Sequence, residues 1–401
     1  MFARRTEWNL AANRFSQALT AHRAAGKAVL DLSVSNPTTV GIQYDSAAIR
    51  AALSDPQGMT YQPEPKGLLS ARQAIANYYA ERHAPSQPKF SPDTENIVLT
   101  ASTSEAYSFV FKLLCEPADE VLIPAPSYPL FEFLAAMEDT RLVPYTLRYH
   151  NDEGWGMDQG SVERAITSRT RAIIVVHPNN PTGSYVSEDE KSQLNKLCAA
   201  HDMAVIADEV FLDFEHSGNP RPSFAAQHPA PPALTFTLSG LSKIAGLPQI
   251  KVAWLVMNGE GKILSEARSR LEIVADTFLS VGTPAQLAAP ALLAQRHHFQ
   301  DQLRVRISGN LRRLDALLGA QQLCSRLESE AGWYAILRVP ATQPDEEVAI
   351  HLLERRGVLV HPGHFYDFPH AGYLVVSLIG PPAQFASAAE IMLEEIGRLF
   401  G

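Results

Sequence analysis

Short runs of apolar residues recur through the middle of the chain, and each is separated from the next by polar or helix-forming segments. These runs occupy residues 97–100, 121–123, 172–176, 203–207 and 234–238. A continuous apolar run is typical of a strand that is buried on both faces, because a strand with one exposed face alternates apolar and polar residues. Segments with a helical pattern lie among them, at residues 68–81 and from residue 103 onward. The pattern therefore predicts an α/β fold in which helices cover both faces of a mainly parallel sheet.

The two ends of the chain carry shorter signals. Residues 29–34 form an apolar run that predicts a short strand. Before this run, four arginines at roughly helical spacing indicate a helical arm, and Glu7 argues against a transit peptide, which contains few acidic residues. Near the C-terminus, residues 333–339 and 373–379 are apolar and predict two further strands.

Composition and charge narrow the class of partner. The 401 residues are 46% hydrophobic and carry a net charge of −9, so nucleic acid is not expected as the main partner, since phosphate binding favours a basic surface. No apolar run is long enough to cross a membrane. Cys115, Cys198 and Cys324 are odd in number and far apart, which predicts neither a disulfide framework nor a metal site and suits a reducing compartment. We expect a cytoplasmic protein that acts on small molecules and binds no metal.

Chemically useful side chains follow the predicted strands. In a parallel sheet the carboxyl ends of the strands share one edge, so these side chains are expected to meet in one cleft. Each residue alone has an ordinary interpretation: a serine caps a helix, a tyrosine packs in the core, and a lone lysine is exposed. Together they provide an amine, a carboxylate, an amide, an aromatic ring and a helix N-terminus, which are the groups that pyridoxal phosphate requires. They are Ser102, Tyr128, Asn180, Asp208 and Lys243.

Three motifs in fixed order carry a family resemblance. They are Asn-Asn-Pro-Thr-Gly at 179–183, Asp-Glu-Val at 208–210 and Ser-Gly-Leu-Ser-Lys at 239–243. With them, the chain resembles, over essentially its whole length, the fold-type I pyridoxal-phosphate enzymes of the class I/II aminotransferase family. The resemblance implies a large domain over residues 47–290 with a mainly parallel seven-stranded sheet. It also implies a smaller α+β domain from residues 1–46 with 291–401, and a homodimer with shared active sites.

The resemblance also implies roles for individual residues. Lys243 would form the Schiff base with pyridoxal phosphate and move the proton, and Asp208 would pair with the pyridinium nitrogen. Asn180 would hydrogen-bond the ring oxygen, and Tyr128 would stack on the ring. Tyr61 would reach the phosphate of the neighbouring subunit. The phosphate in the same subunit would be held by Ser102, Thr103, Ser104 and Ser242.

Three positions depart from the family pattern. Phe211 replaces a tyrosine that donates to the ring oxygen, so we expect the pKa of the Schiff base to be raised. Lys251 replaces a phosphate-binding arginine, so a lysine ammonium, which acts as a point charge, replaces a guanidinium that can donate two parallel hydrogen bonds. Val375 replaces the arginine that grips the substrate carboxylate, a contact whose loss from a formed pair costs roughly 2–5 kcal/mol.

The substrate side of the site is therefore open at this stage. Arg338 is a candidate to supply the missing positive charge, and Asn36 is a further candidate contact. His361 and His364 lie near the expected substrate entrance, and we favour a surface or supporting role over catalysis for both. Aromatic residues at 128, 333, 334 and 365 suggest a bulky apolar substrate side chain.

Three functions remain under consideration. The first is an aminotransferase that moves an amino group from an amino acid or an amine to a 2-oxo acid. The second is a lyase or decarboxylase on the same fold, because the carboxylate-binding arginine is missing. The third is a regulatory domain that senses the cofactor, which the acidic charge and the lack of a preceding helix-turn-helix segment disfavour.

Overall fold

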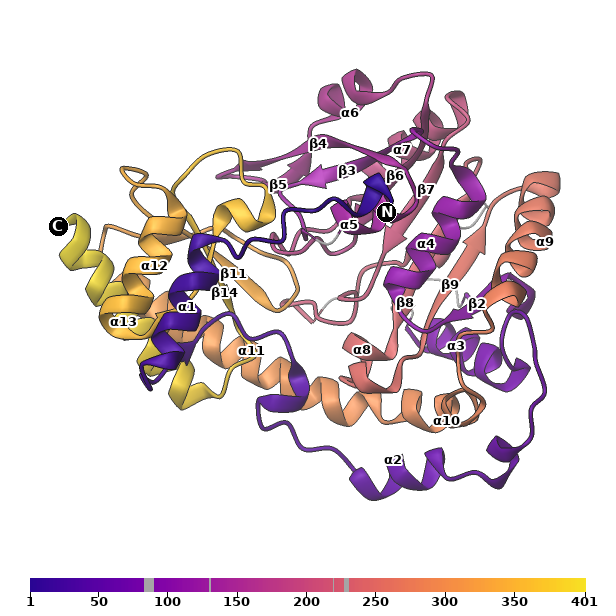
Figure 1. The fold of residues 1–401 in the computed structure, drawn as a ribbon, viewed down its shortest axis with the longest axis horizontal. Helices are drawn as coiled ribbons and strands as arrows, with labels where there is room; N and C mark the ends of the chain where they lie inside the picture. The colour runs from indigo at the N-terminus through magenta and orange to yellow at the C-terminus, as the bar shows by residue number, and fades with distance from the viewer. Residues whose placement is uncertain (83–89, 130, 219, 227–230) are drawn as a thin grey trace.

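A central sheet with helices on both faces forms the larger part of the protein. The computed structural model describes residues 1–82, 90–129, 131–218, 220–226 and 231–401. Eight described strands form this sheet in the order β2-β9-β8-β7-β6-β3-β4-β5 (Figure 1). Their bounds are β2 Ile97–Thr100, β3 Glu120–Ala125, β4 Arg141–His150, β5 Gly154–Met157, β6 Thr170–Val176, β7 Ala204–Asp208, β8 Thr235–Gly240 and β9 Ala253–Asn258.

The five apolar runs all form strands, as predicted. Strands β4, β3, β6, β7 and β8 are parallel to one another, while β9 runs antiparallel between β8 and β2. The sheet contains one strand more than the seven expected, because β5 pairs antiparallel with the outer part of β4. The sequence analysis missed this hairpin because most of β4 is exposed or half-buried and contains Pro144, so it lacks a continuous apolar run.

Helices cover the sheet on both faces. One face packs against α4 (Thr103–Leu114), α5 (Phe131–Met137) and α9 (Gly261–Phe278). The other face packs against α6 (Gln159–Ala165) and α7 (Glu188–Ala200) at one end. At its other end it packs against α3 (Leu69–Glu81), α8 (Leu241–Ile244) and α10 (Thr283–Ala294), and α2 (Ser46–Leu53) lies beside α10. This arrangement leaves the carboxyl ends of the parallel strands as the edge where side chains from several strands meet.

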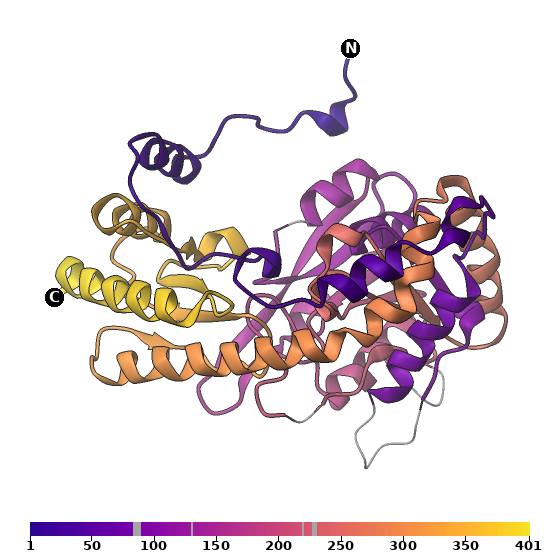
Figure 2. The same cartoon turned by 90° about the horizontal axis from the view of Figure 1, so that it is seen from below.

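A second, smaller sheet lies beside the first (Figure 1). It has the order β10-β11-β14-β13, and β1 pairs in parallel with β12. The strands are β1 Leu30–Asp31, β10 Ser325–Arg326, β11 Tyr334–Arg338, β12 Val358–Leu359, β13 His361–Pro362 and β14 Tyr373–Ser377, and the helices are α1 Arg14–Ala24, α11 Arg296–Gly319, α12 Asp345–Arg356 and α13 Pro382–Phe400. The long helix α11 extends from this part of the molecule beneath the large sheet (Figure 2).

The N-terminal arm is helical only in part. Helix α1 begins at Arg14, and the chain before it is irregular apart from a short 3-10 turn. The arm reaches back to the large sheet, where Arg5 pairs with Asp139 and Trp8 lies 5.7 Å from Phe133 between ring centroids. The arm thus runs from α1, which packs against α12, to α5 on one face of the large sheet.

The proposed domain boundaries, after residues 46 and 290, fall at the start of α2 and inside α10. The division of the chain at these points stays a proposal. Among the described helices, none alone is long and apolar enough to cross a membrane, although the bent pair α9 and α10 passes that test together by length and composition.

Replacing Gly246 with alanine is expected to destabilise the protein by at least about 2 kcal/mol, because the residue has φ +65° and a new Cβ would overlap the ring of Phe299. Thermal denaturation measures this loss. Gly309→Ala is the matched control, since Gly309 lies within α11 with no atom within 4 Å of a new Cβ, and it should add about 0.5–1 kcal/mol. Equal melting temperatures for the two variants would contradict the packing argument.

Candidate active site

A cavity of about 460 Å³ lies where the parallel strands end, facing the smaller sheet. All five side chains that the sequence placed at this edge line it. Asp208 is the last residue of β7, and Lys243 lies in the short helix α8 that directly follows β8. Thr103, Ser104, Phe211 and Ser242 line the same cavity. The convergence at one sheet edge, predicted from strand order alone, is therefore present.

Lys243 lies half-buried among aromatic rings. Its Nζ is 4.8 Å from the centroid of the Trp333 ring and 5.5 Å from that of Phe211. Burial lowers the pKa of Lys243 to about 8, and the negative charge of Asp208 opposes part of this shift. About a tenth of an amine with this pKa is uncharged at pH 7, far more than for an ordinary lysine, and the uncharged form is the one that attacks a carbonyl carbon.

Asp208 is held by two donors. The hydroxyl of Tyr107 donates to Oδ2 at 3.0 Å, and the backbone N–H of Val210 donates to Oδ1 at 3.1 Å. Burial raises the pKa of Asp208 to about 6, while these two donors and Lys243 lower it. The carboxylate is therefore ionised above about pH 6 and can hold a cationic nitrogen.

The sequence analysis did not identify Tyr107 as a site residue. Burial and the neighbouring Asp208 charge raise the pKa of Tyr107 well above its usual value, so the phenol keeps its proton and donates. Its position gave a usable signal: it lies one turn after Thr103, and residues four apart on a helix share a face. When the N-terminus of a helix faces a site, a tyrosine one turn after the first helical residue is thus a candidate contact.

The N-terminus of α4 forms the opposite side of the cavity. Ser102 caps the helix, and its Oγ accepts from the N–H of Glu105 at 3.1 Å. Thr103 and Ser104 follow at the first two helical positions, whose N–H groups have no partner within an α-helix. Hydroxyls and amides at the positive end of the helix dipole suit an anionic group.

Asn180 adds a further unmet polar group. Its side chain is buried, and Oδ1 finds no hydrogen-bond partner among the described residues. A buried amide oxygen without a partner is costly unless a bound molecule completes it. The cavity can therefore hold a flat, polar aromatic molecule with an anionic group at the α4 end and a nitrogen at the Asp208 end.

Other expected contacts lie elsewhere. Asn36 is exposed, and its Oδ1 accepts from the N–H of Thr38 at 3.0 Å. Tyr61 is 76% exposed and lines a separate small hollow near the C-terminal end of α9. Lys251 is exposed, with φ +59°, and is not among the residues that line the cavity.

The two positions expected to decide carboxylate binding are also away from the cavity. Arg338 is exposed at the end of β11, with its guanidinium 5.9 Å from the centroid of the Tyr149 ring. Val375 is 1% exposed in the core of the smaller sheet. Neither side chain lines the cavity. The geometry thus gives Arg338 no place at the site.

Aromatic and neutral side chains form the wall on the side of the smaller sheet. Tyr334, Phe365 and Tyr366 line it together with His361. His364, by contrast, is exposed and does not line the cavity. The structure thus separates the two histidines that the sequence analysis considered together.

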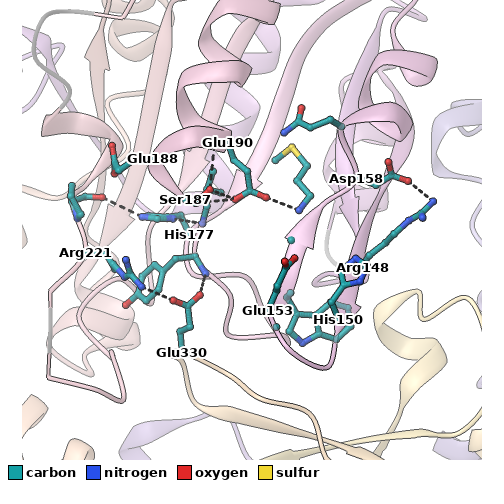
Figure 3. Close-up of a pocket in the computed structure, with 18 of the residues that line it drawn as sticks. Arg148, His150, Glu153, Asp158, His177, Ser187, Glu188, Glu190, Arg221 and Glu330 are labelled. Carbon is teal, nitrogen blue, oxygen red and sulfur yellow. Dashed lines mark hydrogen bonds and ion pairs between the residues drawn. The ribbon is translucent and has the colours of Figure 1, made fainter.

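A second and larger hollow, of about 690 Å³, lies beside the β4–β5 hairpin (Figure 3). Four of its charged side chains form two pairs: Arg148 lies 2.6 Å from Asp158, and Arg221 lies 2.8 Å from Glu330. Glu190 caps α7 and accepts from the N–H of Met157 at 2.7 Å. These contacts join the hairpin, α7 and the loop that carries Glu330. None of the site residues predicted from the sequence lines this hollow.

Comparisons with known proteins give a consistent picture. The family model described as "Aminotransferase class I and II" matches residues 27–390. An alanine aminotransferase of Mycobacterium bovis is 27% identical over 92% of this chain and 85% of its own length. The glutamate-pyruvate aminotransferase AlaA of Escherichia coli is 30% identical over 67% of this chain and 64% of its own length. Among solved structures, an alanine aminotransferase from Pyrococcus furiosus has a TM-score of 0.88 and 21% identity, covering 99% of this chain and all of the other.

Proposed function

Because the chain belongs to the class I and II aminotransferase family, we propose that it is a pyridoxal-phosphate-dependent enzyme that transfers an amino group from an amino acid or amine to a 2-oxo acid. One observation carries the assignment to this cavity: Lys243, with its lowered pKa, lines the same cavity as the ionised Asp208. Perturbed groups that converge in one cavity mark functional sites more often than structural ones.

The residues of the cavity fit pyridoxal phosphate. Ser102, Thr103, Ser104 and Ser242 would hold the phosphate near the N-terminus of α4. Asp208 would hold the ring nitrogen in its protonated form, and the unpartnered amide of Asn180 would face the ring oxygen. Tyr128, which is 44% exposed at the cavity, would cover the ring. When bound, the cofactor supplies a carbonyl that receives the amino group and a ring that accepts electrons.

Lys243 then has two tasks. Its amine would anchor the cofactor, and as a free amine it would carry the proton between the two carbon atoms that exchange it. A pKa near 8 suits this role, because proton transfer is most efficient when the pKa of the carrier lies near the working pH. The rings of Trp333 and Phe211 limit the access of water to the amine.

The lyase alternative is less well supported than amino transfer. The curated relatives are named for the transfer of amino groups, and their names make alanine, glutamate and pyruvate the first donors and acceptor to test. The aromatic wall of the cavity favours donors with an apolar side chain in addition.

A single half-reaction separates these functions. The holoenzyme is mixed with alanine, glutamate, phenylalanine or 2-phenylethylamine, with no 2-oxo acid present. An aminotransferase is expected to lose the absorbance of its lysine-bound cofactor and to release one equivalent of the carbonyl product. Return of the starting spectrum with release of ammonia or carbon dioxide would replace the proposal with elimination or decarboxylation.

We further propose that the enzyme is a homodimer. Large apolar side chains are exposed on neighbouring elements of the large domain, among them Met59, Tyr61, Ile273 and Phe278. Exposed apolar groups of this size favour a protein interface. The cytoplasmic location stays a prediction.

A further inference from the structure

The acceptor in the proposed reaction carries a carboxylate, and the cavity must provide for its charge. Among the described residues that line the cavity, only Lys243 and His361 can carry a positive charge. Lys243 is already assigned to anchoring the cofactor and moving the proton. The other side chains of this wall are aromatic rings and hydroxyls, which offer hydrogen bonds without charge.

The position of His361 is fixed by two contacts. It lies in β13 directly opposite Val375 of β14, so its ring projects beside the buried sheet position that carries no charge. Its Nδ1 lies 3.0 Å from the hydroxyl of Tyr366. The backbone carbonyl of Tyr366 accepts from the N–H of Ser127, which follows β3 of the large sheet. The imidazole is thus anchored on Nδ1, and no hydrogen bond joins Nε2 to a residue in the part of the chain that the structure describes.

We propose that His361 binds the substrate carboxylate and that it takes up one proton from solvent when the carboxylate binds. This inference rests on the proposed function, since it concerns the same cavity. It makes His361 a specificity-determining residue, whose preference for carboxylates depends on pH.

The surroundings of His361 support a neutral ring before the substrate arrives. Burial lowers the pKa of His361, and the charge of Asp31 opposes this only in part. A carboxylate within contact distance favours the charged imidazolium, so its arrival raises the pKa and draws in a proton. Three titratable groups bear directly on the ring: Tyr366 contacts it, Tyr334 lines the same cavity, and the charge of Asp31 on β1 acts on it. Asp345 on α12, His364 on η7 (Gly363–Tyr366) and Tyr373 on β14 belong to elements that pack against β13.

Apart from His364, which is exposed and does not line the cavity, none of these neighbours can carry a positive charge. Burial raises the pKa of Tyr334 and of Tyr366, so both stay neutral. Asp345 is engaged by the N–H groups of Gly372 and Tyr373. Above the pKa of free His361, carboxylate affinity should therefore fall with rising pH, by up to about tenfold per pH unit.

The test uses holoenzyme and 3-phenylpropanoate, a carboxylate without an amine that binds without turnover. Calorimetry at pH 7 in two buffers with different ionisation enthalpies measures the protons taken up, and we expect close to one per site. Between pH 6.5 and 8.5 the Kd should rise. His361→Asn should abolish both effects, and His361→Gln serves as a second variant if the first does not fold. His364→Asn is the matched control and should keep both effects, because His364 lies three residues away and does not line the cavity.

Three results would overturn the inference. They are binding without proton uptake, proton uptake that persists in the folded His361 variants, and no binding of 3-phenylpropanoate at pH 6.5. A kinetic experiment compares phenylalanine with 2-phenylethylamine, which has no carboxylate. Only the KM of phenylalanine should rise with pH, because only phenylalanine requires protonated His361. Because the calorimetry requires no turnover, proton uptake in a protein that fails to transfer amino groups would refute the proposed function while leaving the role of His361 intact.

Discussion

Replacing Lys243 with alanine is expected to lower the rate of amino transfer by at least about a thousandfold, because the variant loses both the amine that anchors the cofactor and the group that moves the proton. The fold should survive, since Lys243 is half-buried and its removal leaves the rings of Trp333 and Phe211 in place. The half-reaction described above, run with a donor that converts the wild-type enzyme, measures the rate.

A second measurement on the same variant reports the anchoring alone. Borohydride reduction of the loaded protein should add the mass of the cofactor to the wild type and to Lys196→Ala, but not to Lys243→Ala. Lys196 is the matched control because it is exposed on α7, away from the cavity. A mass increase in Lys243→Ala, or an unchanged rate, would show that the covalent partner is another lysine.

The parts of the fold that the sequence predicted well are those in which burial controls residue type. Strands such as β6 and β7 are buried on both faces, so their residues are apolar without interruption. The site residues at their ends could then be placed together, because parallel strands share a carboxyl edge. This reasoning predicts from the sequence alone that Asp208 and Lys243 meet at one edge, and both line the same cavity in the structure.

The parts that were missed depend on pairing between distant segments. Strand β4 is largely exposed, so its sequence carries no continuous apolar signal. Tyr107 reaches Asp208 across 101 positions of the chain. The sequence placed both His361 and His364 near the substrate entrance, but only the pairing of β13 with β14 shows that His361 lines the cavity and His364 does not. Arg338 was a reasonable candidate by charge, but it is the exposed last residue of β11, and its guanidinium lies near the ring of Tyr149 and not at the cavity. The pattern of apolar and polar residues along a strand does not show which face of the strand meets a site formed by distant segments.

The second large effect is expected at Asp208. Replacement by asparagine removes the negative charge that would keep the ring nitrogen protonated, and we expect the rate to fall by roughly 10²- to 10⁴-fold, the range typical of a lost proton-controlling group. Cofactor affinity should fall as well, because a neutral amide does not pair with a cationic nitrogen. Equilibrium dialysis measures the affinity, and the half-reaction measures the rate. Wild-type values for both would remove Asp208 from the site.

Tyr107→Phe tests how the charge on Asp208 is maintained. The carboxylate form of Asp208 is the one proposed to bind the cofactor. Burial raises the pKa of Asp208 to about 6, so affinity for the cofactor should be lost as the pH falls through about 6. Removing the Tyr107 donor destabilises the ionised form, and a hydrogen bond to a charged group contributes about 1.5–3 kcal/mol, so the loss should move upward by roughly one pH unit or more. Tyr145→Phe removes another buried hydroxyl, which donates to the carbonyl of Ile174, and should leave the midpoint unchanged. If both variants kept the wild-type midpoint, the Tyr107 contact would be structural and Asp208 would owe its ionisation to Val210 and Lys243.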